Sequence, residues 1–357
     1  MGRLGKWCNH KKIKSVKIFL VDIESVPTRY TCEWKTHVPQ LLRDNGFDVI
    51  VIEGDLTIPE AATPGAFLNF GGTNMYKSTQ VHKLAELFTH GHIQEGDHII
   101  FTDAWHPGII NVKYMSELLN IPVVTHGLWH AGSYDPNDFL GRLVGDKPWI
   151  RHAEQAMIAA YNHNWIATAA HFKLMSKTYY ISHNQSFNKT GWPMEYTHDM
   201  IAPRLWSQKE NIVVFPHRIA PEKRLDLFQE LADRPELKHY QFCVAMEMNL
   251  NKQEYHELLQ RARFAVSFAD QETLGISMYE SACAGACPIV PNRLSYTEMY
   301  DPMFKRADNV DSVVKAILEY EQRDLSEHVA QLAIKLHNNF FSATKLINTL
   351  KDYNERK

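Results

Sequence analysis

Two glutamates and a glycine follow an apolar segment in the second half of the chain. Residues 263–269 read RFAVSFA, and the next stretch places Glu272, Gly275 and Glu280 at the start of a helical pattern. Glycine permits close approach of the backbone, and the first N–H groups of a helix are free to bind an anion. Glu280 lies two turns into the predicted helix, where a carboxylate can accept both hydroxyls of a ribose. Taken alone, two glutamates at this spacing are more often solvated.

A second charged loop follows an earlier predicted strand. Residues 215–228 read FPHRIAPEKRLDLF, with Arg218 and Lys223 between the end of a strand and the start of a helix. Two cations beside a helix N-terminus are suited to bind a pyrophosphate. The alternative for this loop by itself is a solvated turn with positive charge.

Taken together, the two loops resemble the retaining glycosyltransferases of family 4, which have the GT-B fold. One family mark is R-x4-K, here Arg218 and Lys223. The other is E-x7-E, here Glu272 and Glu280, followed by the small-residue turn and strand ACAGACPIVPN. The resemblance covers residues 205–300, and it extends to the N-terminal half only as a strand–helix pattern.

The resemblance implies a role for each residue of the two loops. Arg218 and Lys223 would bind the diphosphate of a nucleotide-sugar donor, with a UDP-sugar as the expected donor, and Glu280 would hold the ribose. The donor sugar would face Glu272 and the backbone of the next residues, Thr273, Leu274 and Gly275. Retention of the anomeric configuration is implied, with no cofactor and no metal required. The sequence leaves open whether a carboxylate nucleophile or same-face attack by the acceptor achieves it.

The chain departs from the family pattern at two places. Residues 22–34, DIESVPTRYTCEW, stand where the family has a glycine-rich turn after the first strand. His217 stands where the family has a glycine before the arginine. The N-terminal contacts to the donor phosphates are therefore unassigned by sequence.

The N-terminal half is expected to bind the acceptor. TDAWHPG (102–108) and THGLWHAGSYDP (125–136) both follow predicted strands, and both place a tryptophan beside a histidine. The family often has a histidine near the reacting sugar at the end of the strand 121–126; His126 fits that place, and His130 is the competing candidate. The alternative for each histidine is a loop or core residue with satisfied hydrogen bonds. The residues expected to contact the acceptor are Asp103, Trp105, His106 and Asp135.

Strand and helix patterns alternate along both halves of the chain. Near-continuous apolar strands favour parallel sheets that are covered on both faces. The polar stretch 182–206 lacks a period and is interpreted as the connection between two halves. The predicted fold is therefore α/β and GT-B, with two Rossmann-like doubly wound domains facing a central cleft. We expect an acceptor domain over 1–190, a nucleotide-sugar domain over 191–335, and a C-terminal helix over 336–357 that packs back on the first domain.

Composition narrows the class of protein. Of 357 residues, 45% are hydrophobic and 22% charged, and the net charge is −3, which gives no global attraction to nucleic acid. The first twenty residues are basic and are interpreted either as a solvated leader or as a phosphate-contacting arm. No apolar run approaches the ~20 residues of a membrane span, and no signal peptide is recognised. Five cysteines without a C-x-x-C pair suit a reducing cytoplasm, which would be the bacterial host's if the protein is phage-encoded.

The acceptor is the least determined part of the prediction. The basic leader and the Trp/His loops resemble glycosyltransferases of tailed bacteriophages, some of which add glucose or arabinose to 5-hydroxymethylcytosine. This resemblance favours hydroxymethylated double-stranded DNA as acceptor, with aromatic side chains supporting a flipped base. The alternatives are a carbohydrate or small-molecule acceptor, a sugar-nucleotide epimerase of the same fold, or a binding module. Basic residues that could contribute to a DNA-binding cleft are Arg29, Lys35, Lys77, Lys113 and Arg142.

Overall fold

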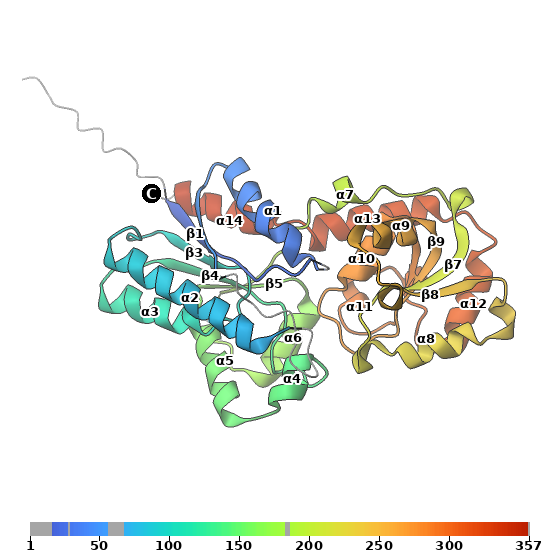
Figure 1. Cartoon of the computed structure of the whole chain (residues 1–357), viewed down its shortest axis with the longest axis horizontal. Coiled ribbons are helices and arrows are strands. Elements are labelled where there is room, and N and C mark those ends of the chain that lie inside the picture. Colours follow the sequence, from blue (N-terminus) through green and yellow to red (C-terminus); the bar gives the residue numbers. More distant parts are fainter. Residues whose placement is uncertain (1–15, 28, 56–67, 183–185, 356–357) are drawn as a thin grey trace, which may run out of the picture.

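Two separate parallel sheets organise the chain. The computed structural model describes residues 16–27, 29–55, 68–182 and 186–355, so most of the predicted basic leader lies outside the described residues. A six-stranded sheet belongs to the first half and a four-stranded sheet to the second, and the two halves lie side by side (Figure 1). All strand pairs in the described ranges are parallel, as near-continuous apolar strands predict. The α/β class with parallel sheets is thereby confirmed.

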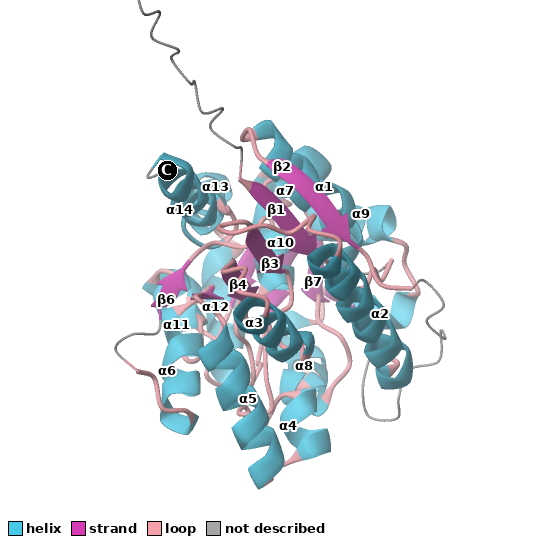
Figure 2. Ribbon diagram, turned by 90° about the vertical axis from the view of Figure 1, so that its left-hand side faces the viewer, coloured by secondary structure: helices cyan, strands magenta, loops and turns pink. Residues whose placement is uncertain are grey.

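The first sheet has the strand order β2-β1-β3-β4-β5-β6. Its strands are β1 (Lys17–Val21), β2 (Asp48–Ile52), β3 (His98–Phe101), β4 (Val124–Leu128), β5 (His163–Ile166) and β6 (Ser186–Lys189). Its helices are α1 (Thr31–Asp44), α2 (Phe70–Thr89), α3 (Gly108–Leu118), α4 (Phe139–Val144), α5 (Pro148–Ala160) and α6 (Ala169–Thr178). Helices α2, α3 and α5 lie on one face of this sheet and α1 on the other (Figures 1 and 2). Both faces are therefore covered, in keeping with the apolar runs KIFLV of β1 and HIIF of β3.

The second sheet has the order β10-β9-β7-β8. Its strands are β7 (Glu210–Phe215), β8 (Gln241–Val244), β9 (Ala262–Val266) and β10 (Cys287–Ile289). Its helices are α8 (Leu225–Ala232), α9 (Lys252–Arg261), α10 (Ile276–Cys283), α11 (Tyr296–Met299), α12 (Val310–Tyr320) and α13 (Ser326–Phe340). Strands β7 and β9 are adjacent and parallel, so the loops that follow them lie side by side at the carboxyl end of the sheet. These are the two loops that carry the sequence motifs.

The stretch between the halves is more ordered than its sequence predicts. Residues 182–206 contain the strand β6 and the short helix α7 (Thr197–Met200). Strand β6 has the sequence SFNK and is an edge strand paired to β5 alone. All four of its residues are partly exposed, so it lacks the apolar run by which the other edge strand, β2, is recognised. The division of the chain at residues 190 and 335 remains a prediction.

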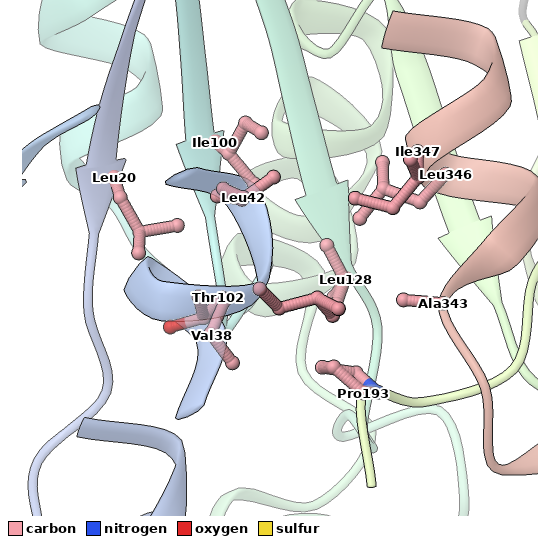
Figure 3. A pocket seen from close by; sticks show the side chains of 11 residues that line it. Leu20, Val38, Leu42, Ile100, Thr102, Leu128, Pro193, Ala343, Leu346 and Ile347 are labelled. Carbon is pink, nitrogen blue, oxygen red and sulfur yellow. The ribbon is translucent and has the colours of Figure 1, made fainter. Parts of the chain in front are cut away.

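The last helix returns to the first half. Helix α14 (Thr344–Glu355) lies beside β1 and α1 (Figure 1). Leu346 and Ile347 line an apolar crevice with Leu20 of β1 and Leu128 of β4 (Figure 3). Burial of these aliphatic side chains stabilises the return of the chain by about 1.5–3 kcal/mol for each fully buried residue.

No helix in the described ranges has the length and apolarity needed to cross a bilayer.

Candidate active site

A buried ion pair joins the loops that follow β7 and β9. The loop after β7 forms the single turn η2 (Pro221–Lys223), which ends at Lys223. Its Nζ lies 3.0 Å from Glu272 Oε2 and donates to the Gln271 carbonyl, and the lysine side chain is only 7% exposed. The R-x4-K and E-x7-E motifs, 49 residues apart at this pair, are thus directly bonded to each other.

Glu272 is held in its charged form. Burial alone would raise the pKa of this carboxyl, but Lys223, His217 and the Gly275 backbone N–H outweigh burial and lower the pKa to about 2. Its Oε1 also faces the Leu274 N–H at 3.4 Å. An ionised carboxylate with this pKa can accept hydrogen bonds from sugar hydroxyls, and it cannot serve as an acid near neutral pH.

Glu280 titrates in the opposite direction. Helix α10 begins after Gly275, whose φ of +78° is in the left-handed region, and an added Cβ there would lie 2.9 Å from the Tyr296 ring. Glu280 lies in the second turn of α10, where burial raises its pKa to about 7 against the opposing effects of Lys252 and Tyr255. The Tyr255 hydroxyl donates to Glu280 Oε2 at 3.4 Å. Near pH 7 Glu280 is therefore partly protonated and partly ionised, and a ligand that donates hydroxyl hydrogen bonds would favour the ionised form.

Arg218 is anchored by a carboxylate of its own loop. Its Nη2 lies 2.5 Å from Glu222 Oε1, and the other carboxylate oxygen accepts from Arg142 Nη1 at 2.8 Å. Arg142 lies on α4, so this carboxylate connects the two halves of the chain. Burial would raise the pKa of Glu222, but the two arginines lower it. The arginine predicted for the diphosphate is therefore next to a second arginine that the motifs do not include.

His217 occupies the position where the resemblance predicts glycine. It is 5% exposed, and burial lowers its pKa to about 3, so the imidazole is neutral. Nδ1 lies 3.0 Å from Ser277 Oγ, whereas Nε2 is buried and has no hydrogen-bond partner among the described residues. An unpaired buried nitrogen beside Lys223 and Glu272 costs stability unless a ligand atom reaches it.

His130 is the candidate histidine that reaches the second half. Its Nε2 is 2.6 Å from the Thr102 carbonyl and must donate, so Nδ1 accepts from the Tyr30 hydroxyl at 2.6 Å. Burial lowers its pKa to about 4. The hydroxyl of Thr273 donates to the His130 carbonyl at 3.1 Å, and Thr168 donates to the Thr273 carbonyl at 2.9 Å. His130 and the loop after β9 are thus in direct contact.

His126 does not join this group. It is fully buried within β4, with Nε2 2.8 Å from His98 Nδ1 and its ring stacked on His163 at 4.8 Å. Both of those rings contact Tyr353 of α14. Side chains alternate across a strand, and residues 126 and 128 both point to the face that α14 covers. Of the two competing histidines, the structure brings only His130 to the motif loops.

Two of the residues predicted for the acceptor have structural partners. Trp105 donates its indole N–H to Glu154 at 2.7 Å. His106 is buried; its Nδ1 accepts from the Gly108 N–H at the start of α3, and Nε2 lies 3.1 Å from Gln80 Oε1. Both ring nitrogens of His106 therefore have hydrogen-bond partners, as expected for a structural histidine of the core.

The two predicted aspartates lie nearer to the motif loops. Asp103 binds Lys77 at 2.8 Å, and although burial raises the pKa of this carboxyl, Lys77 and His130 lower it on balance. Asp135 is buried, which raises its pKa, while the Asn137 backbone N–H, Gln271 and Lys223 act against the rise. Asp135 thus lies beside the ion pair, and Asp103 beside His130.

Glu24 is a residue of this region that the sequence did not single out. It follows β1 and is buried; Oε1 accepts from Thr73 at 2.8 Å, and Oε2 has no hydrogen-bond partner in the part of the chain that the structure describes. Burial raises the pKa of the Tyr30 hydroxyl, and the charges of Asp103, Glu24 and Glu272 raise it further, so all three carboxylates lie within electrostatic reach of Tyr30. The available sequence indication was its place in DIES, directly after an apolar strand. In the described residues no cluster of three or more His, Cys, Asp or Glu side chains has the geometry to hold a metal ion.

Comparison with known proteins supports the fold over nearly the whole chain, and one curated relative matches a part of the sequence. No family model matches the sequence. The chain is 31% identical over 117 residues to the tRNA-queuosine alpha-mannosyltransferase of Drosophila melanogaster, a match that spans 30% of this chain and only 29% of that protein. The match is thus to less than a third of the curated relative.

Solved structures resemble this chain far beyond that segment. Sucrose-phosphate synthase from Thermosynechococcus elongatus has a TM-score of 0.65 at 11% identity and covers 96% of this chain and 100% of its own. Starch synthase IV from Arabidopsis thaliana, bound to ADP and acarbose, has a TM-score of 0.59 at 11% identity, with 96% and 99% covered. HepE from Anabaena, in complex with UDP and glucose, has a TM-score of 0.58 at 12% identity, with 94% and 100% covered. At such identities the likeness shows the fold, and the predicted GT-B fold of the glycosyltransferases is confirmed.

Proposed function

We propose that this chain is a glycosyltransferase that moves a sugar from a nucleoside-diphosphate donor to a hydroxyl group. The observation that carries the proposal is the buried Lys223–Glu272 pair, which joins the two motif loops at the carboxyl ends of adjacent parallel strands. In doubly wound folds, ligands bind at such strand ends. Solved structures of the same fold hold UDP or ADP, which supports a nucleotide-sugar donor.

The residues of the second half would bind the donor as the resemblance implies. Arg218 and Lys223 would neutralise the diphosphate as it leaves, because fixed positive charge in a water-poor site stabilises developing negative charge. Glu272 is ionised and would accept hydrogen bonds from hydroxyls of the donor sugar. Glu280 would accept those of the ribose. The unpaired Nε2 of His217 offers one more donor or acceptor beside them.

Retention is proposed to arise from same-face attack. The bond from the anomeric carbon to the diphosphate oxygen breaks, the bond to the acceptor oxygen forms on the same face, and the acceptor's proton moves to the departing diphosphate. His130 is poorly suited to take this proton, since both of its ring nitrogens are engaged, one by Thr102 and one by Tyr30. Its proposed role is to fix Tyr30 and the Thr273 backbone at the meeting point of the two halves.

For the acceptor we propose a hydroxyl of a modified nucleoside in tRNA, with mannose as the leading sugar. The support is the partial match to a tRNA-queuosine alpha-mannosyltransferase. The hydroxymethylcytosine expected from the phage resemblance shares the chemistry of a hydroxyl on a modified base, but the relative's name points to RNA. The sequence favours UDP as the nucleotide of the donor, and the experiment below compares UDP-sugars with GDP-sugars.

The test is transfer followed by nucleoside mass spectrometry. Purified protein is incubated with tRNA containing queuosine, tRNA lacking it, or duplex DNA containing 5-hydroxymethylcytosine, each with a panel of UDP- and GDP-sugars that includes mannose. We expect a hexose mass increase on queuosine alone, absent in Glu272→Ala and retained in Glu257→Ala, an exposed glutamate of the same half. Hexose or pentose on the DNA base alone would replace tRNA with DNA as the acceptor. No transfer to any acceptor would contradict the proposal.

A further inference from the structure

One buried carboxylate is shared by two arginines from opposite halves of the chain. Arg142 Nη1 lies 2.8 Å from Glu222 Oε2, and Arg218 Nη2 lies 2.5 Å from Glu222 Oε1. The glutamate side chain is 2% exposed, whereas the side chains of Arg142 and Arg218 are 32% and 30% exposed. The trio by itself carries a net charge of +1, and both arginine side chains are partly exposed to solvent.

Arg142 is held at this position by the turn before α4. The Asp138 side chain accepts from the Leu140 N–H at 3.0 Å and begins the helix. A Cβ at Gly141 would lie 1.9 Å from the Asp135 carbonyl, so only glycine allows this close packing. Nη1 of Arg142 also donates to the Asn137 carbonyl. The turn thus directs a guanidinium from the N-terminal half at the loop that carries R-x4-K.

We propose that Arg142 binds the donor diphosphate together with Arg218 and Lys223, and that Glu222 holds the two arginines when no nucleotide is bound. This inference rests on the proposed function. A guanidinium has five N–H donors, so its bonds to Glu222 and Asn137 leave donors for phosphate oxygens. A diphosphate carries more negative charge than one carboxylate and matches the fork of a guanidinium, so it competes for both arginines.

The assignment fills the place that the sequence leaves open in the first half. Residues 22–34, where the resemblance predicts a glycine-rich phosphate-binding turn, contain no glycine. The loop after β1 instead carries the buried Glu24 and, next to Tyr30, Arg29. Arg142 adds from α4 a cation of the N-terminal half that directly contacts the loop with R-x4-K.

The competing interpretation is that the arginine only fastens the two halves together. A fastener would affect every ligand of the cleft alike, whereas a phosphate contact affects only ligands that contain phosphate. The ratio of affinities for a nucleoside diphosphate and for its nucleoside therefore separates the two interpretations.

The experiment measures binding of UDP, GDP and ADP, and of the matching nucleosides, by calorimetry. For the nucleotide that the wild type binds best, we expect Arg142→Ala to weaken binding by about 10- to 100-fold, the range of a lost hydrogen bond to a charged group. Nucleoside binding should change less than about twofold, since no charged contact is lost. The diphosphate affinity of Arg142→Lys should lie between those of the wild type and Arg142→Ala. The matched control is Lys147→Ala, an exposed cation five residues away, which should bind as the wild type does.

Each other outcome has a definite meaning. Wild-type affinity for the diphosphate in Arg142→Ala overturns the inference and leaves the proposed function standing. Equal losses for nucleoside and diphosphate also overturn it in favour of a fastener. If Arg142→Ala fails to fold, Arg142→Lys decides by the same ratio. A wild-type protein that binds none of the three nucleoside diphosphates overturns the proposed function and this inference with it.

Discussion

The proposed ribose contact of Glu280 predicts that nucleotide binding depends on pH. Burial raises the pKa of this carboxyl to about 7, against the effects of Lys252 and Tyr255. A ribose offers two hydroxyl donors, and only the ionised carboxylate can accept from both without first losing a proton. Affinity should therefore be present above pH 7 and be lost as the pH falls below it.

The magnitude follows from the pKa. If only the ionised form binds, the apparent Kd is multiplied by about 1.1 at pH 8 and by about 11 at pH 6, so affinity falls about tenfold over these two pH units. A factor of ten corresponds to about 1.4 kcal/mol. Binding at pH 6 should also release nearly one proton from Glu280.

The assay is calorimetric titration of the nucleoside diphosphate at pH 6, 7 and 8 for the wild type and Glu280→Gln. The phosphate of the ligand titrates in the same range, but it does so equally for both proteins, so the ratio of their affinities isolates Glu280. We expect that ratio to change about tenfold between pH 8 and pH 6. Identical pH profiles for the two proteins, or a wild-type affinity that rises as pH falls, would refute the assignment.

Three further predictions concern the same region. Lys223→Met leaves the Glu272 carboxylate buried without its cation and should lower the free energy of unfolding by about 3–5 kcal/mol in urea titrations; an unchanged midpoint would contradict the ion pair. The buried Oε2 of Glu24 has no hydrogen-bond partner among the described residues, and we propose that it accepts from the acceptor hydroxyl. Glu24→Gln should then lower kcat/KM for the acceptor by about 10- to 100-fold without changing donor affinity; equal transfer rates would remove Glu24 from the site. The pKa of three buried histidines is depressed by burial to about 3, so they bind fewer protons folded than unfolded, and stability present above pH 6.5 is lost as the pH falls. Between pH 7.5 and pH 5.5, each histidine should lower the free energy of unfolding by about 1.4 kcal/mol, and the three together by about 4 kcal/mol. A free energy of unfolding that stays constant over this range in urea titrations would contradict the lowered pKa values. These histidines are His106, His171 and His217.

The motif loops were predictable because the residues of each motif lie close together in the sequence. Arg218 and Lys223 follow one apolar strand, and Glu272 follows another, so a strand–loop–helix pattern was enough to place them at sheet edges. Their contact depends on β7 and β9 being adjacent, which the resemblance implied and the strand order shows. Strand β6 was missed because its sequence, SFNK, has no apolar run.

The N-terminal half was harder to predict because its contacts join distant segments. The choice between His126 and His130 depends on where β4 ends. His126 lies inside the strand on the face that α14 covers, whereas His130 lies beyond the strand end, where its carbonyl accepts from Thr273. Sequence patterns locate the ends of elements least reliably. Glu24 and Arg142 lie 118 residues apart, and neither belongs to a motif. Their significance appears only when Glu222 and the unpaired oxygen of Glu24 are seen in three dimensions.

The most direct test of the central claim is acceptor-dependent release of a nucleoside diphosphate from a nucleotide sugar. Protein is mixed with the sugar-nucleotide panel with and without tRNA, and released nucleotide is measured. We expect release that requires tRNA, that disappears in Lys223→Ala, and that persists in Lys238→Ala, an exposed lysine of the same half. An epimerised sugar nucleotide with no released diphosphate, or no release with tRNA, DNA or carbohydrate acceptors, would contradict a glycosyltransferase.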